Sequence, residues 1–198
     1  MGKILVFALL LIIIYPHIAF AEEIETKAHL PWNLDSQKTI YVLINSESEI
    51  SESKKTIIDD VIMSEKSVML DHQNYFEGWQ GALDQIPYSD NTPLRLIFTD
   101  NEKPSNMIII NLKDGSSKFD GFTKFDLNKN NIVKSYITIY NSKNLNDVDF
   151  EKILCHEFGH SLGLEHSKNI NNIMFPILDQ SNHYLSNDNI SALSLLYG

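Results

Sequence analysis

The chain has 198 residues, 43% of them hydrophobic, and a formal net charge of −10 at neutral pH. This length fits one ordinary domain, and the apolar content is enough for a packed core, which excludes a wholly disordered protein. An acidic surface repels nucleic acid and anionic membranes, so neither is an expected partner.

Residues 1–21 are predicted to be a secretory signal peptide, followed by one domain over residues 22–198. Lys3 gives a short positive start, and the apolar run ILVFALLLIII is too short to span a bilayer comfortably. The small residues Ala19 and Ala21 then stand before a cleavage site, and the alternative is an uncleaved membrane anchor. Cleavage would remove Lys3 and take the net charge from −10 to −11. We therefore expect a secreted or periplasmic protein that is soluble and monomeric.

Strands dominate the middle of the chain, after one long helix. Apolar residues recur at helical intervals from about Ser53 to Ile86, with a few slips, and Pro87 marks the end of this predicted helix. Gly78 and Gly81 near its end allow close packing. Segments rich in branched and aromatic residues predict five strands, at 38–45, 93–100, 106–112, 119–126 and 132–141.

Two further helices are predicted in the C-terminal third of the chain. The first carries a group of histidines and begins near Asp147 or Asp149, either of which can cap it. The second begins after Ser186 and has Ile190 and Leu193 on one face. The sequence thus predicts an α/β (α+β) fold: a mixed, mainly five-stranded sheet with a long helix, a histidine-bearing helix and a C-terminal helix.

The segment HEFGHSLGLEH has the spacing of a catalytic zinc site. His156 and His160 are four residues apart, so on a helix both side chains lie on one face and can reach one metal ion. Gly163 tolerates a left-handed backbone, so the helix can end there and His166 can fold back as a third ligand. Glu157 follows the first histidine, where its carboxylate can reach a water at the metal without ligating it. Three nitrogen ligands leave one position open, whereas structural zinc sites are closed by four ligands.

The alternative interpretation is three unrelated histidines on a solvated helix. It is disfavoured, because these five fixed residues arise by chance at on the order of one start position in 10⁷. Cys155 is the only cysteine, so we expect no internal disulfide. It projects from the helix roughly 100° away from His156, so a small buried apolar role is favoured over a reactive thiol near the metal.

The pattern H-E-x-x-H-x-x-G-x-x-H resembles the zinc signature of the metzincin metallopeptidases, and HEFGHSLGLEHS is most similar to the matrixin (matrix metalloproteinase) branch. That clan has a methionine turn beneath the metal, and NNIMFP places Met174 eight residues after His166. The resemblance, more bacterial than animal in outline, implies a secreted zinc endopeptidase that acts on peptides or proteins. It implies one catalytic Zn²⁺ held by His156, His160 and His166, with Glu157 as the general base.

The resemblance also implies where a substrate binds. The loop 175–185 would line the specificity pocket, with Phe175, Pro176 and Tyr184 as candidate residues; ordinary packing is the alternative for the two aromatic side chains. The predicted strand containing GFTKFD would be the sheet edge that pairs with an extended peptide.

Two features depart from the family pattern or leave its cofactors open. The family has two consecutive aspartates in the closing helix, where this chain has Asp188 and Asn189, which puts an anchoring role of the second carboxylate in doubt. The segment DLNKNN (126–131) resembles half of a calcium loop, but it lacks the glycine and the distant glutamate, so a hairpin turn is favoured. Ca²⁺ at another site would be in keeping with the family, but no ligands for it can be assigned.

The rival function is a secreted zinc-binding module that recognises peptides or proteins without cutting them.

Overall fold

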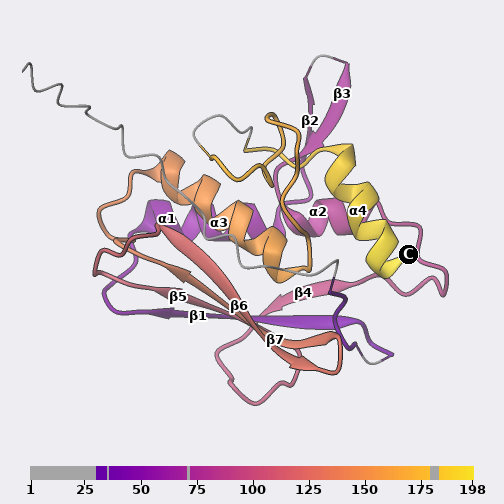
Figure 1. Cartoon of the computed structure of the whole chain (residues 1–198), viewed down its shortest axis with the longest axis horizontal. Coiled ribbons are helices and arrows are strands. Elements are labelled where there is room, and N and C mark those ends of the chain that lie inside the picture. The colour runs from indigo at the N-terminus through magenta and orange to yellow at the C-terminus, as the bar shows by residue number, and fades with distance from the viewer. Residues whose placement is uncertain (1–29, 35, 71, 179–182) are drawn as a thin grey trace, which may run out of the picture.

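The computed structural model describes residues 30–34, 36–70, 72–178 and 183–198. These ranges contain four helices and seven strands (Figure 1). The signal peptide predicted for residues 1–21 lies outside the described residues. Within the described part of the chain, every helix is too short or too polar to cross a bilayer.

A five-stranded sheet with the strand order β4-β1-β5-β7-β6 forms one layer of the molecule (Figure 1). The strands are β1 (Thr39–Ser46), β4 (Arg95–Phe98), β5 (Met107–Leu112), β6 (Gly121–Asn128) and β7 (Asn131–Ile139). Neighbouring strands are parallel except β6, which is antiparallel to β7 and forms one edge of the sheet. The five predicted strands and the mixed sheet are therefore confirmed, with ends displaced by a few residues.

A tight hairpin joins the two strands at this edge. Asn128 of β6 pairs with Asn131 of β7, so the connection is two residues long. Lys129 in that connection has a φ of 58°, the left-handed conformation that such short turns need. The predicted hairpin turn within residues 126–131 is confirmed.

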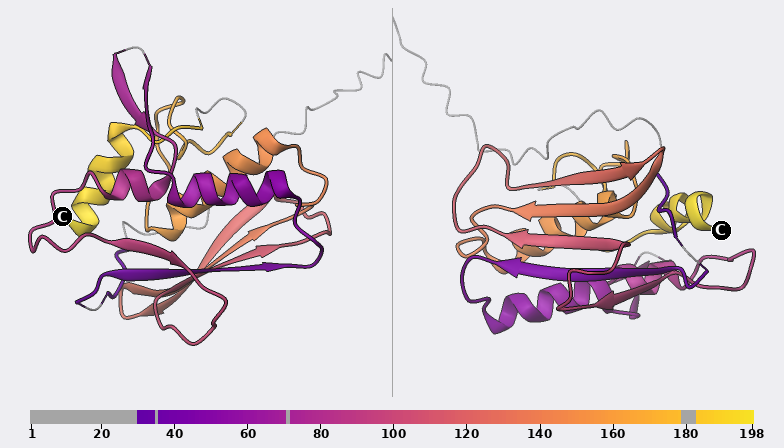
Figure 2. Two further views of the ribbon diagram at one scale, coloured as in Figure 1. Left: turned by 180° about the vertical axis from the view of Figure 1, so that it is seen from behind. Right: turned by 90° about the horizontal axis from the view of Figure 1, so that it is seen from below.

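The helices α1 (Glu52–Met63) and α3 (Asp147–Ser161) lie on the same face of the sheet and contact each other (Figures 1 and 2). Side chains of a strand alternate between its two faces, so every second residue of the central strands can contribute to this interface. The buried strand residues with 0–1% exposure include Ile40, Val42, Ile108, Ile110 and Ile137. This apolar layer fixes the position of α3, which carries the histidines, over β6 and β7.

The long helix predicted for residues 53–86 is wrong. After α1, the chain forms the antiparallel hairpin of β2 (Ser67–Leu70) and β3 (Gln73–Phe76), and only then the short helix α2 (Trp79–Leu83). Figure 1 shows this hairpin projecting from the helical layer, away from the large sheet. The slips in the helical periodicity coincide with this interruption.

Close contacts at two glycines explain how the chain returns after the hairpin. Ser64 ends α1 in an extended conformation. A Cβ atom added to Gly78 would lie 2.5 Å from the carbonyl oxygen of Ser64, and one added to Gly81 would lie 2.8 Å from it. The two glycines therefore do allow close packing, as predicted, but against the end of α1. The base of the hairpin is held by reciprocal 2.9 Å backbone hydrogen bonds between Phe76 and Leu185.

The closing helix α4 (Asn187–Tyr197) begins after Ser186, as predicted. Its last residue reaches the end of the histidine-bearing helix, where the Tyr197 hydroxyl donates a 2.7 Å hydrogen bond to the carbonyl of Leu162. Helix ends leave carbonyl groups without intrahelical partners. This contact satisfies one of them and fixes α4 against α3.

Candidate metal centre

The N-terminus of α3 is capped by Asn146, whose side-chain oxygen accepts a 2.9 Å hydrogen bond from the backbone N–H of Asp149. The prediction that Asp147 or Asp149 is the cap is therefore wrong, because both lie within the first helical turn. Their carboxylates there face the positive end of the helix dipole, which is a favourable position. Phe150 and Phe158, both 0% exposed, anchor the helix in the core.

Gly163 ends this helix as the sequence predicted. Its φ is 90°, and a Cβ atom at this position would lie 2.3 Å from the carbonyl oxygen of Leu30. A side chain is therefore excluded both by backbone conformation and by space. The resulting turn brings His166 back beside the last turn of α3, next to His160.

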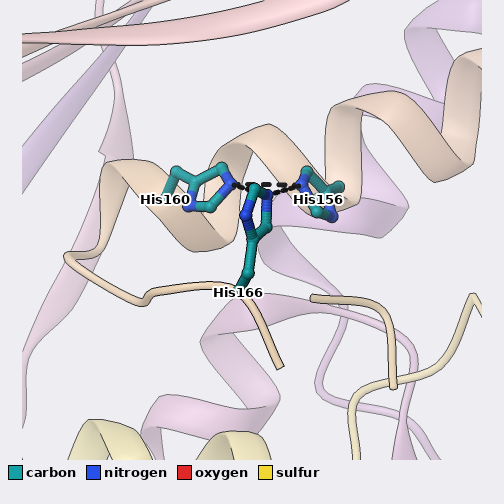
Figure 3. A group of neighbouring side chains, drawn as sticks. All are labelled: His156, His160 and His166. Atoms are coloured by element: carbon teal, nitrogen blue, oxygen red, sulfur yellow. Dashed lines mark hydrogen bonds between the residues drawn. The ribbon is translucent and has the colours of Figure 1, made fainter. Parts of the chain in front are cut away.

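Figure 3 shows the rings of His156 and His160 projecting from α3, with His166 reaching between them from the following loop. The three Nε2 atoms are 3.1 Å apart for His156 and His160, 3.2 Å for His160 and His166, and 3.3 Å for His156 and His166. Two nitrogens that each lie about 2.0–2.1 Å from a tetrahedral zinc ion are about 3.3 Å from each other. The spacing of the triad therefore fits three ligands of one such ion.

The other ring nitrogens fix the tautomers of two of these histidines. The Nδ1 of His156 lies 2.7 Å from the carbonyl oxygen of Ile173, and the Nδ1 of His160 lies 2.8 Å from that of Leu164. A carbonyl can only accept, so each Nδ1 carries the hydrogen and donates it. Each Nε2 then has a free lone pair, and the two lone pairs face the same point. A cation at that point relieves their repulsion, and the Nδ1 contacts orient the rings as in known zinc sites.

Burial keeps both helical histidines neutral near pH 7. It lowers the pKa of His156 well below its ordinary value, and neighbouring His160 adds to this effect. Burial likewise lowers the pKa of His160 to about 4, with His166 as the next cause. Neutral imidazole is the form that binds metal ions, so the environment of the triad favours ligation.

Glu157 is 2% exposed and points from α3 towards β6. The Thr123 hydroxyl lies 2.6 Å from its Oε2 atom and donates a hydrogen bond to it. Burial raises the pKa of Glu157 to about 7, while the contact with Thr123 lowers it. A carboxyl group that titrates near neutral pH can both accept and return a proton. No sequence motif pointed to Thr123, which lies 34 residues before Glu157 along the chain.

Met174 lies against the segment of α3 between the two helical histidines. It is 1% exposed, and a Cβ atom added to Gly159 would lie 2.3 Å from its sulfur. The same Cβ would lie 2.9 Å from the ring of Trp79. Gly159 is therefore required for the close approach of Met174 and Trp79 to the helix.

We expect Gly159→Ala to destabilise the protein by about 1–3 kcal/mol, the usual effect of overpacking a tight core. Gly115 offers a matched control, since a Cβ atom there meets nothing within 4 Å. Gly115→Ala is expected to stay within about 0.5 kcal/mol of the wild type. Urea unfolding of the two variants measures the difference, and equal stabilities would contradict the tight contact.

An amide pair fixes the turn that contains Met174. The Asn172 side-chain oxygen accepts hydrogen bonds from the Met174 backbone N–H at 2.8 Å and from the Asn189 amide at 3.0 Å. The Asn189 oxygen in turn accepts from the backbone N–H of Ser186 at 2.9 Å. Asn189 is buried, whereas Asp188 is exposed. The family's second aspartate is replaced here by Asn189, and its side-chain amide holds the turn that contains Met174 through Asn172.

Asn189→Ala is expected to lower the free energy of unfolding by about 1–3 kcal/mol, because it removes both hydrogen bonds between the buried amides of Asn172 and Asn189. Asn187 lies in the same helix and is exposed. Asn187→Ala is therefore the control, with an expected change within about 0.5 kcal/mol. Comparable losses in both variants, measured by chemical denaturation, would show that the amide pair does not hold this turn.

The candidate pocket residues lie on both sides of residues 179–182, which fall outside the described part of the chain. Phe175, Pro176 and Tyr184 are all partly exposed. The Tyr184 ring packs against His183, with a centroid distance of 4.0 Å. Their role in a specificity pocket stays a prediction.

Cys155 is completely buried, and its sulfur lies 3.8 Å from the carbonyl oxygen of His183. Burial raises the pKa of this thiol far above its ordinary value. The thiolate is the reactive form of cysteine. The structure therefore supports the buried apolar role over the alternative of a reactive thiol.

Comparison with known proteins agrees with this geometry. A family model described as Matrixin matches residues 64–198, more than half of the chain. Interstitial collagenase of Bos taurus is 40% identical over 58 residues, which are 29% of this chain and 12% of the bovine protein. Matrix metalloproteinase-C of Caenorhabditis elegans is 37% identical over 86 residues, which are 39% of this chain and 14% of that protein. The matched regions are thus a small part of either relative.

The fold also has a counterpart among solved structures. Metalloproteinase-II from Bacteroides fragilis superposes with a TM-score of 0.50 and 18% sequence identity, over 93% of this chain and 59% of that one. At this identity the likeness concerns the fold alone, and it agrees with the predicted metzincin-like architecture. The match of the family model over most of the domain, including the histidine helix and the closing helix, shows that this chain belongs to the matrixins, a family of zinc metalloendopeptidases.

Proposed function

We propose that this chain is a secreted, zinc-dependent endopeptidase. The proposal depends on one observation: the Nε2 atoms of the three triad histidines lie within 3.3 Å of one another. The buried carboxylate of Glu157 directly follows the first of these histidines, His156. When bound there, zinc lowers the pKa of a coordinated water towards about 7 and polarises the scissile carbonyl. Export would follow from the signal peptide predicted over residues 1–21.

The residues of the site would divide the work. His156, His160 and His166 would hold the ion, and the two tautomers fixed by backbone carbonyls support this assignment. Glu157 would take the proton of the attacking water and hand it to the leaving amine. Met174 would support the ligands from beneath without coordinating, as its packing against Gly159 of α3 suggests.

The substrate would bind as an extended peptide along β6. This strand is the edge of the sheet next to α3, so one side of its backbone can pair with an added strand. Phe175, Pro176 and Tyr184 would contribute to the pocket for a substrate side chain. Peptide binding at a sheet edge positions the scissile bond through backbone contacts, which favours an endopeptidase with broad sequence tolerance.

The test is cleavage of an unstructured protein such as casein by the purified mature chain. We expect cleavage that a chelator abolishes and that added zinc restores. Cleavage that persists in the chelator would contradict a zinc enzyme. Retention of casein without any cleavage by the zinc-loaded protein would instead support the rival, a recognition module, against which the presence of Glu157 argues.

A further inference from the structure

The carboxylate of Glu157 is held by the edge strand of the sheet. The Thr123 hydroxyl, on β6, lies 2.6 Å from Glu157 Oε2 and 3.1 Å from the carbonyl oxygen of the same residue. The second carboxylate oxygen, Oε1, has no hydrogen-bond partner among the described residues. Thr123 is 4% exposed, so water does not compete freely for its hydroxyl.

A second residue of the same strand leaves room for this arrangement. Gly121 and Thr123 are two residues apart, so they face the same side of β6. A Cβ atom added to Gly121 would lie 3.1 Å from Glu157 Cγ, 3.2 Å from Oε1, and only 2.7 Å from a methyl group of Ile153. The carboxylate therefore occupies the space that a side chain at position 121 would fill, and Thr123 closes that space at one end.

We propose that Thr123 is a positioning residue for peptide hydrolysis: its hydroxyl holds Oε2 of Glu157 so that Oε1 stays free to accept the proton of the attacking water. The inference rests on the proposed function. The same strand would bind the substrate backbone and orient the base, so both would be fixed to one rigid element. A hydrogen bond from a neutral hydroxyl to an ionised oxygen is short and strong, which agrees with the 2.6 Å separation.

The alternative is that the hydrogen bond between Thr123 and Glu157 only stabilises the fold. A second buried hydrogen bond between α3 and the sheet serves as the control for this alternative. Ser135 on β7 and Ser161 on α3 are both 0% exposed, and their hydroxyl oxygens are 2.9 Å apart. This pair ties the same helix to the same sheet but does not touch Glu157. Removing either contact deletes one buried hydroxyl interaction between α3 and the sheet.

The experiment compares Thr123→Val, Thr123→Ser and Ser135→Ala in the zinc-loaded full-length mature protein. Valine keeps the shape of threonine and suits a strand, so it removes the hydroxyl with little other change. For Thr123→Val we expect kcat to fall about tenfold to a hundredfold, with KM and zinc content unchanged, because a misplaced catalytic group loses rate on this scale. Thr123→Ser should recover most of the rate, and Ser135→Ala should keep the wild-type kcat.

A crystal structure of Thr123→Val supplies a readout independent of activity. We expect the Glu157 carboxylate to be rotated or spread over several orientations, while the three histidine rings stay in place. Unchanged kcat in Thr123→Val, or an equal loss of kcat in Ser135→Ala, would overturn the positioning role. An undisturbed carboxylate in the crystal would overturn it as well.

The outcome can be separated from failure of the proposed function itself. If the wild-type protein fails to cleave casein, or if Glu157→Gln cleaves normally, the endopeptidase proposal fails. If Glu157→Gln is inactive while Thr123→Val is fully active, only the positioning role fails. In the Glu157→Gln background, Thr123→Val should cause no further loss of residual rate, because the two residues act through one carboxylate.

Discussion

Glu157→Ala is expected to retain zinc and to lose at least about a hundredfold in kcat, the usual contribution of general acid–base catalysis. Zinc stays because the three imidazoles of the triad are converged without help from this carboxylate. The rate falls because alanine has no group that can accept a proton in place of the buried Glu157 carboxylate. Zinc content by elemental analysis and initial rates on a peptide substrate measure the two effects separately.

Glu157→Gln is the matched control for the cavity that alanine leaves. Glutamine has the same shape and can still accept the hydrogen bond from Thr123, but it is not a base. Both variants should therefore show the same large loss of kcat, while Glu157→Gln should have the higher free energy of unfolding. Near-normal turnover in either variant would remove Glu157 from the role of general base.

Removing zinc is expected to lower the melting temperature of the protein markedly. A ligand that binds only the folded state stabilises it by about 4 kcal/mol when its free concentration is a thousandfold above Kd. In a domain of this size that corresponds to roughly 8–16 °C. The structural reason is that, without zinc, the Nε2 lone pairs of His156 and His160 are opposed at 3.1 Å, where His156 is fully buried and His160 is partly buried.

Thermal unfolding with zinc and after dialysis against a chelator measures this shift. His160→Ala should abolish it, so that the melting temperature no longer depends on zinc. His183→Ala is the control, because this histidine is half-buried and lies outside the triad. A full zinc-dependent shift in His160→Ala, or its loss in His183→Ala, would contradict the assignment of the ligands.

Some predictions succeeded because their causes are local. The branched and aromatic residues that favour an extended backbone lie within each strand itself, so the five strands could be predicted without knowledge of their order in the sheet. The closing helix after Ser186 follows from a cap and an apolar face within twelve residues. The prediction of a helix over residues 53–86 failed because short apolar repeats fit helix and hairpin alike. The close contact between Gly78 and Ser64, at the end of α1, is a tertiary contact, and the hydrophobic periodicity of the sequence does not reveal it.

The sequence by itself determined the triad, because His156, His160, Gly163 and His166 lie within eleven consecutive residues and one helix followed by one turn brings them together. Only the tertiary structure decided how Glu157 is oriented and buried, and how the methionine turn is anchored. These depend on hydrogen bonds that join residues 34 and 17 positions apart, between Thr123 and Glu157 and between the amides of positions 172 and 189. Such pairs form only when separate elements pack, and no local pattern encodes that packing.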